Sequence, residues 1–201
     1  EKLDYLYLLT VNDIKATNPA LWNGWKHGLL KDLFLLTRSK INKEPVQTIK
    51  EITEDRKKNC IRSFIEEKDK KKIKNYLENF DDSFFTKNNL DKLKWQCDLI
   101  INSEINKTVI GARKCFDNLL EIFIKTENFD GLFLKLVQVF QLSGLEIIDA
   151  HISTSTNKAI AANTFIAKYS FHNRPLSNAE VQDVKLKICL LYTSDAADDT
   201  P

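Results

Sequence analysis

Residues 120–125 read Leu-Glu-Ile-Phe-Ile-Lys, and this stretch decides the fold class because the spacing of apolar residues changes there. Apolar residues recur at helical intervals before it, whereas here Leu120, Ile122 and Ile124 alternate with Glu121, Phe123 and Lys125. Such alternation is typical of a β-strand with one strongly apolar face. The sequence therefore predicts a helical N-terminal part followed by a sheet.

Downstream of this strand the pattern continues as helix, strand, strand, helix. Residues 132–140 carry apolar side chains at helical spacing, and Gly144 is suited to a left-handed C-cap. Strand patterns return at residues 145–153 and 163–169, and Ser177 can cap a last helix. The order βαββα predicts a truncated ferredoxin-like unit that lacks its fourth strand. The fold class is therefore predicted to be α+β.

Upstream of the strand, helical patterns fill the chain. Residues 3–14 carry apolar side chains around most of the circumference, which predicts a helix buried on several sides and ended by Pro19. A second helix is expected over residues 20–40, and two helices cannot make a core alone. Residues 41–104 are polar and Lys-rich but keep helical spacing, which predicts a helical connector.

Composition and charge exclude several classes of partner. Thirty Lys and Arg residues against 28 Asp and Glu leave a formal net charge of +2, so no field of one sign dominates the surface. The Lys-rich run at residues 68–74 is diluted by acidic neighbours and is expected to be a solvated helix face. No apolar run approaches the roughly 18 to 20 residues of a spanning helix, and no signal peptide is evident. We therefore expect a cytoplasmic protein that binds neither membranes nor nucleic acid.

The cysteines are spread along the chain and form no Cys-x-x-Cys pair. Free cysteines are usually buried, so we interpret all four as isolated buried thiols in a reducing compartment. They are Cys60, Cys97, Cys115 and Cys189.

The two ends of the chain are unusual. The chain begins at Glu1 and contains no Met, so we expect it to be a fragment of a longer protein. Residues 189–201, Cys-Leu-Leu-Tyr-Thr-Ser-Asp-Ala-Ala-Asp-Asp-Thr-Pro, resemble translated sequencing-adapter read-through. We expect this segment to be a non-native tail, with the original protein continuing past Ile188.

Motifs in the helical part resemble a known family. Residues 6–19, Leu-Tyr-Leu-Leu-Thr-Val-Asn-Asp-Ile-Lys-Ala-Thr-Asn-Pro, are followed by residues 21–26, Leu-Trp-Asn-Gly-Trp-Lys. Together they resemble the end of the HD-type hydrolase domain of the bacterial bifunctional PII uridylyltransferase/uridylyl-removing enzymes. Residues 80–85, Phe-Asp-Asp-Ser-Phe-Phe, and residues 93–96, Leu-Lys-Trp-Gln, are similar to the connector of that family. Gln96 stands where the family usually has His, so we assign that position no role.

The sheet region resembles the first ACT domain of the same family. The matching segments are residues 121–124, 128–133, 148–155 and 163–166. The resemblance thus divides the chain into the C-terminal end of the HD-type hydrolase (uridylyl-removing) domain (1–40), the helical connector (41–104), an incomplete ACT domain (105–188) and the tail (189–201).

The resemblance implies that the intact parent is an enzyme with two activities. The parent is expected to use UTP and a divalent metal, Mg or Mn, to attach uridylyl groups to the PII signalling protein when glutamine is low. It is expected to remove them hydrolytically when glutamine is high. Its nucleotidyltransferase centre would lie upstream, so this fragment alone is expected to be inactive. Pairing between ACT units is expected within the parent.

The resemblance also makes Asp13 the candidate catalytic and metal-binding residue. In HD-type phosphohydrolases a His, a His-Asp pair and a later Asp hold the metal, and Asp13 lies in the corresponding helix. A carboxylate in an apolar helix is costly to bury unless it meets a cation or a donor. The alternative is that Asp13 faces solvent or caps a turn near Pro19. His27 and His172 have no supporting cluster and are expected to be structural or exposed.

Six residues form the expected glutamine-binding site. Gly131 at a strand-to-helix junction allows close approach of the backbone, and the amides that begin the next helix can bind a carboxylate. The resemblance associates this loop with glutamine, although Asn128 replaces the usual Asp. Asp149 and His151 are two residues apart and share a strand face; the alternative is an ordinary surface pair. The full set is Asn128, Asp130, Gly131, Leu132, Asp149 and His151.

Two alternatives to the bifunctional enzyme remain open. The chain could be a non-catalytic amino-acid-binding ACT module on a helical scaffold. The parent could also be an HD hydrolase that acts on a nucleotide second messenger, although the pattern at residues 22–26 favours the first family. The upstream sequence would separate these possibilities, because only the bifunctional enzyme requires both a His-Asp dyad and a nucleotidyltransferase centre.

Overall fold

The structure is a computed structural model that describes residues 1–17, 22, 24–43, 48–104, 107–115, 119–171, 174 and 176–198. The chain divides into two compact units, Glu1–Thr48 and Ile49–Pro201. No helix among the described residues is long and apolar enough to cross a membrane.

The first unit contains two helices, α1 (Lys2–Thr17) and α2 (Gly24–Ile41). They pack against each other, and the rings of Tyr7 and Phe34 lie 4.7 Å apart between centroids. No residue of α1 is buried, so the prediction of a helix buried on several sides is wrong. Within this unit a single partner helix covers only one side of α1. The apolar side chains of Leu29, Leu33 and Leu36 in α2 are exposed as well.

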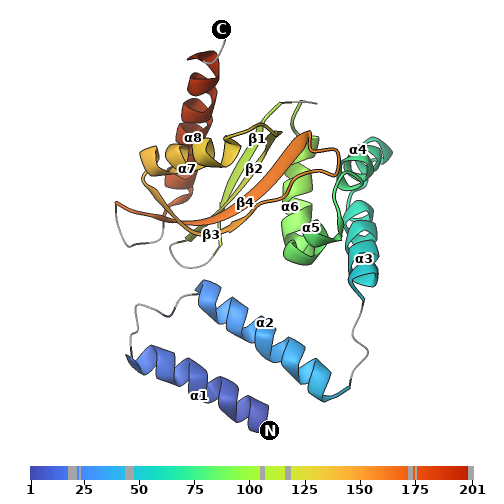
Figure 1. Cartoon of the computed structure of the whole chain (residues 1–201), viewed down its shortest axis with the longest axis vertical. Helices are drawn as coiled ribbons and strands as arrows, with labels where there is room; N and C mark the ends of the chain where they lie inside the picture. Colours follow the sequence, from blue (N-terminus) through green and yellow to red (C-terminus); the bar gives the residue numbers. More distant parts are fainter. Residues whose placement is uncertain are drawn as a thin grey trace. The chain divides into compact units, whose positions relative to one another are not determined.

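The second unit combines a four-stranded sheet with six helices among its described residues. Its elements are α3 (Ile49–Arg62), α4 (Glu67–Leu77), α5 (Asp82–Lys87), α6 (Leu90–Ile101), β1 (Val109–Lys114), β2 (Leu119–Glu127), α7 (Leu132–Leu142), β3 (Leu145–His151), β4 (Ile160–Tyr169) and α8 (Asn178–Asp198). The strand order is β1-β2-β4-β3, and every neighbouring pair is antiparallel (Figure 1). The α+β class is confirmed, and β2-α7-β3-β4-α8 follows the predicted βαββα order.

Strand β1 was not predicted from the sequence. It pairs with β2 in the register Val109↔Lys125 to Lys114↔Leu120 and occupies the sheet edge beside it. Only two apolar residues precede Gly111, which is too short a run for a recognisable alternation.

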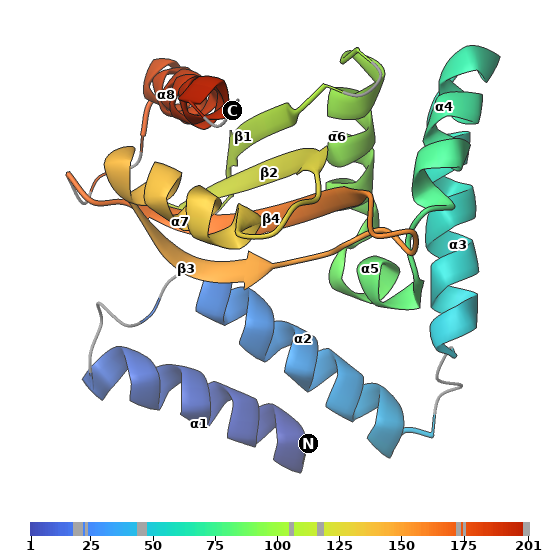
Figure 2. The ribbon, with the colours of Figure 1, turned by 45° about the horizontal axis from the view of Figure 1, so that its top comes forward.

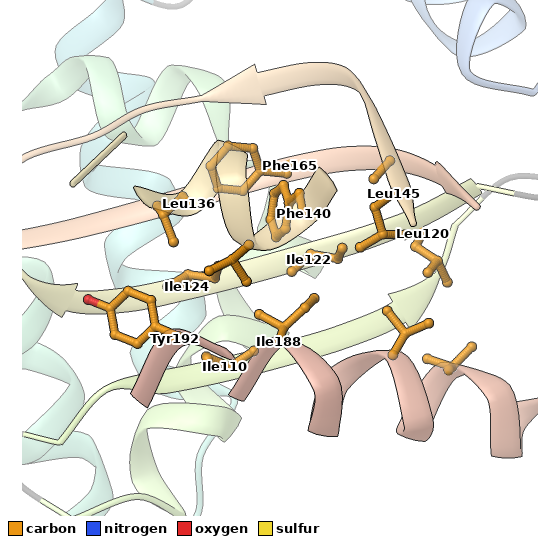
Figure 3. Close-up of a cluster of buried hydrophobic side chains, with 14 of the residues drawn as sticks. Ile110, Leu120, Ile122, Ile124, Leu136, Phe140, Leu145, Phe165, Ile188 and Tyr192 are labelled. Atoms are coloured by element: carbon orange, nitrogen blue, oxygen red, sulfur yellow. The ribbon is translucent and has the colours of Figure 1, made fainter. Parts of the chain in front are cut away.

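Helices α7 and α8 cover one face of the sheet, as Figures 1 and 2 show. The rings of Phe140 from α7 and Phe165 from β4 meet edge to face at 4.7 Å between centroids. Figure 3 shows these rings among the side chains that fill this core, and α8 contributes Ile188 and Tyr192. The core also contains Leu120, Ile122, Ile124, Leu136 and Leu145.

The predicted connector covers the opposite face of the sheet. Phe123 of β2 and Ala162 of β4 share a core with the connector helices, including Phe84, Leu93 and Cys97. Figure 2 shows α6 on the side of the sheet away from α7. Strand β2 is therefore buried on both faces, whereas the sequence predicted a single apolar face. Residues 49–101 form a packed layer of the second unit rather than a free linker.

Two predicted helix ends agree with the structure, while the predicted end at Pro19 lies outside the described residues. Ser177 and Glu180 form a reciprocal capping pair at the start of α8: the Glu180 amide donates to Ser177 Oγ, and the Ser177 amide donates to Glu180 Oε2. Gly144 follows α7 with φ of 74°, which confirms the left-handed C-cap. Helix α8 continues through residues 189–198, which the sequence assigned to the tail.

A buried carboxylate fastens α6 to the sheet. Glu121 of β2 is only 2% exposed, and its Oε1 lies 2.9 Å from Lys92 Nζ of α6. Arg113 of β1 donates from Nε to Glu121 Oε2 at 2.8 Å and stacks over the Trp95 ring at 4.4 Å. Arg113 also pairs with the exposed Asp91. A buried charge requires such partners, because taking it out of water is costly.

Substituting Glu121→Gln should lower the free energy of unfolding by about 2 to 3 kcal/mol, because it leaves two cations without their buried partner. The matched substitution Asp91→Asn removes an exposed partner of Arg113 and should cost less than about 1 kcal/mol. Urea denaturation followed by circular dichroism measures both values. Equal losses in the two variants would contradict a special role for the buried carboxylate.

Gly111 allows α6 to lie close to β1. A Cβ atom at this position would be 2.2 Å from Leu99 Cδ1 of α6 and 3.1 Å from the Trp95 ring. Gly111→Ala should therefore destabilise the second unit by about 1 to 3 kcal/mol through overpacking. Leu99→Ala removes the clashing atom, so the double variant should be more stable than the sum of the two single losses predicts. Strict additivity in denaturant unfolding would contradict this contact.

Candidate functional site

The structure places Asp13 on the exposed surface of α1. Among the described residues no three His, Cys, Asp or Glu side chains are grouped so that they could hold a metal ion. The metal-binding role of Asp13 therefore stays a prediction. His27 is exposed and lies edge-on to the Trp22 ring at 5.6 Å, while His172 lies outside the described residues.

The loop between β2 and α7 is fixed where it leaves the sheet. The Asn128 amide donates to the Ala159 carbonyl at 2.9 Å, and Asn128 Nδ2 donates to the Lys158 carbonyl at 2.9 Å. Both acceptors directly precede β4, which pairs with β2. The side chain of Asn128 thus has a structural partner, which the sequence did not indicate.

Gly131 then turns the chain into α7. Its φ is 87°, in the left-handed region that only glycine adopts without strain, and it occupies the N-cap position of the helix. A Cβ atom here would have no heavy atom within 4 Å, so the space around Gly131 is open. No side chain caps the first turn of α7, whose amides attract a negatively charged group.

The two flanking residues of Gly131 differ in exposure. Asp130 is exposed, whereas Leu132 is 5% exposed and belongs to the core between α7 and the sheet. Leu132 therefore anchors the start of α7 and offers no side-chain surface to a ligand. Within the loop, the backbone around Gly131 is the part open to a bound group.

Asp149 and His151 lie on the other face of the sheet. Ala150, between them, packs against the α7 and α8 core, so its two neighbours point toward the connector layer. His151 Nε2 is 3.6 Å from Asp149 Oδ2, and each side chain is about one third exposed. The two residues are thus together, as predicted, but the sheet separates them from the Gly131 loop.

Burial lowers the pKa of His151. Asp149 and Glu121 act in the opposite direction, while Lys92 and Lys87 lower this pKa further. The imidazole is therefore neutral near pH 7, and its contact with Asp149 is not an ion pair there. A neutral imidazole beside a carboxylate can bind a polar ligand through hydrogen bonds, but it adds no positive charge.

Gln96 has a structural role that sequence reasoning missed. Its side chain is fully buried, and Nε2 donates to Asn88 Oδ1 at 2.9 Å and to Thr164 Oγ1 at 3.1 Å. Thr164 of β4 is the register partner of His151, so Gln96 links α6 to the strand beside the Asp149 and His151 pair. The sequence feature that could have indicated this role is the position of Gln96, a polar residue on the buried side of α6, next to Cys97 and close to Leu93.

Comparison with known proteins identifies relatives of this chain. It is 32% identical over 173 residues to the bifunctional uridylyltransferase/uridylyl-removing enzyme of Acinetobacter baylyi, covering 83% of this chain and 19% of that protein. It is also 32% identical over 165 residues to the enzyme of the same name from Xanthomonas euvesicatoria, covering 80% of this chain and 19% of the relative. No protein-family model matches, and no solved structure matches.

The aligned residues therefore include most of the chain but a small part of each relative. The aligned segment is much longer than a single helix or hairpin. The same name recurs among the relatives. Over this segment, about one fifth of their length, the chain matches relatives that are named bifunctional uridylyltransferase/uridylyl-removing enzymes.

Proposed function

We propose that this chain is the segment of a bifunctional uridylyltransferase/uridylyl-removing enzyme that joins the hydrolase to a glutamine-sensing ACT unit. The 32% identity across 83% of the chain carries the proposal. Two features of the second unit support it: an ACT-like βαββα order, and a helical connector that packs directly on the sheet.

The parent would modify the PII signalling protein in response to nitrogen status. It would attach uridylyl groups from UTP when glutamine is low and hydrolyse them when glutamine is high, with Mg or Mn at its catalytic centres. Asp13 would supply one carboxylate ligand to the hydrolase metal, together with residues from other parts of the enzyme. Because this chain spans 19% of its relatives, it is expected to catalyse neither reaction alone.

Glutamine would act at the start of α7. Its carboxylate would meet first-turn amides that no side chain caps, beyond Leu132, whose own amide donates to the Phe129 carbonyl; Gly131 leaves open space there. Binding would favour one arrangement of α7 over another, because a ligand shifts a conformational equilibrium only through its differential affinity. ACT units of the parent would pair to complete this site.

The sheet would carry this shift to the connector. Helix α7 packs on Ile122 of β2 and Phe165 of β4. The next residue of β2, Phe123, points to the other face and packs in the connector core. Gln96 and Glu121 add polar contacts between α6 and the same two strands. A displacement of β2 or β4 therefore moves both helical layers, which would couple the effector loop to the hydrolase side of the chain.

Gly131→Val in the full-length enzyme should raise the glutamine concentration needed for half-maximal control by at least about tenfold. A β-branched residue is strained at this φ and would fill the open space beside the first turn of α7. Steady-state assays of uridylyl transfer across a glutamine titration measure the effect, and activity without glutamine should be retained.

The control is Gly144→Ala at the other end of α7, where φ is also positive and the added Cβ would displace the exposed Phe171 ring. It stresses the helix without touching the loop, so its glutamine response should stay close to that of the unmodified enzyme. An unchanged response in Gly131→Val would remove this loop from the sensor and favour a different effector site.

Asp13→Ala in the full-length enzyme should reduce hydrolytic removal of uridylyl groups by at least about 100-fold, because the metal loses a carboxylate ligand. Uridylyl transfer, at a separate centre, should change by less than about threefold. The control is Asp32→Ala, which removes another exposed carboxylate from the first unit. Equal loss of both activities in a folded Asp13→Ala protein would contradict the metal-binding role.

A further inference from the structure

Two of the four cysteines meet inside the connector. Cys60 of α3 and Cys97 of α6 are 37 residues apart in sequence, and their sulfur atoms lie 3.7 Å apart. Both side chains are fully buried in the connector core, whereas Cys115 and Cys189 are only partly buried. The interpretation of four isolated thiols is therefore wrong for this pair.

The placement of the pair suits a covalent link between two helices. A disulfide needs its sulfur atoms about 2.05 Å apart, so the observed contact must shorten by under 2 Å. Helices α3 and α6 already pack against each other around this contact. Rotation of the two side chains with a small shift of the helices would bring the sulfurs together.

The two thiols differ in acidity. A thiolate at Cys60 would accept the hydrogen bond of the Cys97 thiol, which lowers the pKa of Cys60; Lys94 acts in the same direction, while burial and Asp98 oppose the shift. The same contact and burial raise the pKa of Cys97. Cys60 is therefore the better attacking group, since thiol–disulfide exchange proceeds through the thiolate.

An open pocket is lined by residues close in sequence to the pair, although neither Cys60 nor Cys97 lines it. It has a volume of about 460 Å³, and its lining residues come from α6, from the start of α4 and from the loop after α3. Lys94 and Asp98 flank Cys97 in sequence, and Ser63 Oγ donates to the Cys60 carbonyl at 2.6 Å. The pocket is lined by Ser63, Phe64, Ile65, Glu66, Asp69, Lys94 and Asp98. This volume can accommodate a low-molecular-weight disulfide.

We propose that Cys60 and Cys97 are a reversible redox site, oxidised by low-molecular-weight disulfides to a bond that fastens α3 to α6. The Cys60 thiolate attacks one sulfur of the reagent, the reagent S–S bond breaks, and one thiolate leaves. Cys97 then loses its proton to solvent and attacks the Cys60 sulfur, which expels the second reagent thiolate. Two protein thiols are oxidised to one disulfide, and the reagent is reduced to two thiols.

The site is independent of the proposed catalytic function, because it depends only on the packing of the connector. Both sulfurs are buried, so exchange requires the contact between α3 and α6 to open at the pocket. Once formed, the bond closes a loop that includes α4 and α5 and restricts the unfolded chain.

The test treats the purified chain with 2-hydroxyethyl disulfide under native conditions. Trypsin digestion without reductant should then yield residues 59–62 joined to residues 95–107, identified by mass spectrometry. The thermal midpoint of the oxidised protein should rise by about 5 to 10 °C, because the link restricts the unfolded state. Dithiothreitol should reverse both changes.

Two matched variants separate the pair from the other cysteines. Cys60→Ser should lose the linked peptides and the thermal shift, while Cys115→Ser should keep both. The proposal is overturned if the native protein retains both thiols and forms the link only in urea. Accumulation of a mixed disulfide without the link, or a fall in the thermal midpoint on linkage, would overturn it as well.

Discussion

Burial of strand β2 on both faces is the constraint on which the second unit depends. Its even-numbered residues Ile122 and Ile124 pack beneath α7 and α8, and its odd-numbered residues Glu121 and Phe123 pack beneath the connector. Because successive side chains of a strand point to opposite faces, one stretch of sequence supplies both cores. Neither helical layer can be removed without exposing half of this strand to water. The connector is therefore part of the folded unit, and the sheet is its middle layer.

The sequence predicted those features that depend on neighbouring residues. Alternation identified β2, helical spacing identified α7 and the helical character of the connector, and the caps at Gly144 and Ser177 gave helix ends that agree with the structure. Features that depend on distant contacts were missed. Strand β1 has too few apolar residues to show an alternating pattern, and it lies where Gly111 lets α6 pack closely. The buried role of Gln96 depends on its hydrogen bond to Thr164, 68 residues away. The exposed state of α1 was missed for the same reason, since apolar periodicity indicates a face to be covered but not the element that covers it.

The candidate effector residues were predicted as one set, but the sheet divides them. Gly131 lies at the start of α7, while Asp149 and His151 point toward the connector. Spacing along a strand shows which residues share a face but not which helix covers that face. The division gives the two groups different chemistry. The loop presents backbone amides to an anion, whereas the strand pair presents a carboxylate and a neutral imidazole near the buried Glu121 and Lys92 cluster.

Both helical layers hold the sheet through apolar packing, and α6 adds buried polar contacts to it. Helix α7 contributes Leu132, Leu136, Val139 and Phe140 to a core of apolar side chains, and such contacts tolerate small displacements because they have no preferred direction. Helix α6 is held by Lys92 on Glu121 and by Gln96 on Thr164, and buried polar contacts lose most of their stabilisation when their geometry changes. Under the proposed binding at its N-terminus, a shift of α7 would reach the sheet through these apolar contacts, and the polar contacts would make α6 move with the sheet. A bond between Cys60 and Cys97 would extend this fixed body to α3, because α6 is the helix that carries Cys97.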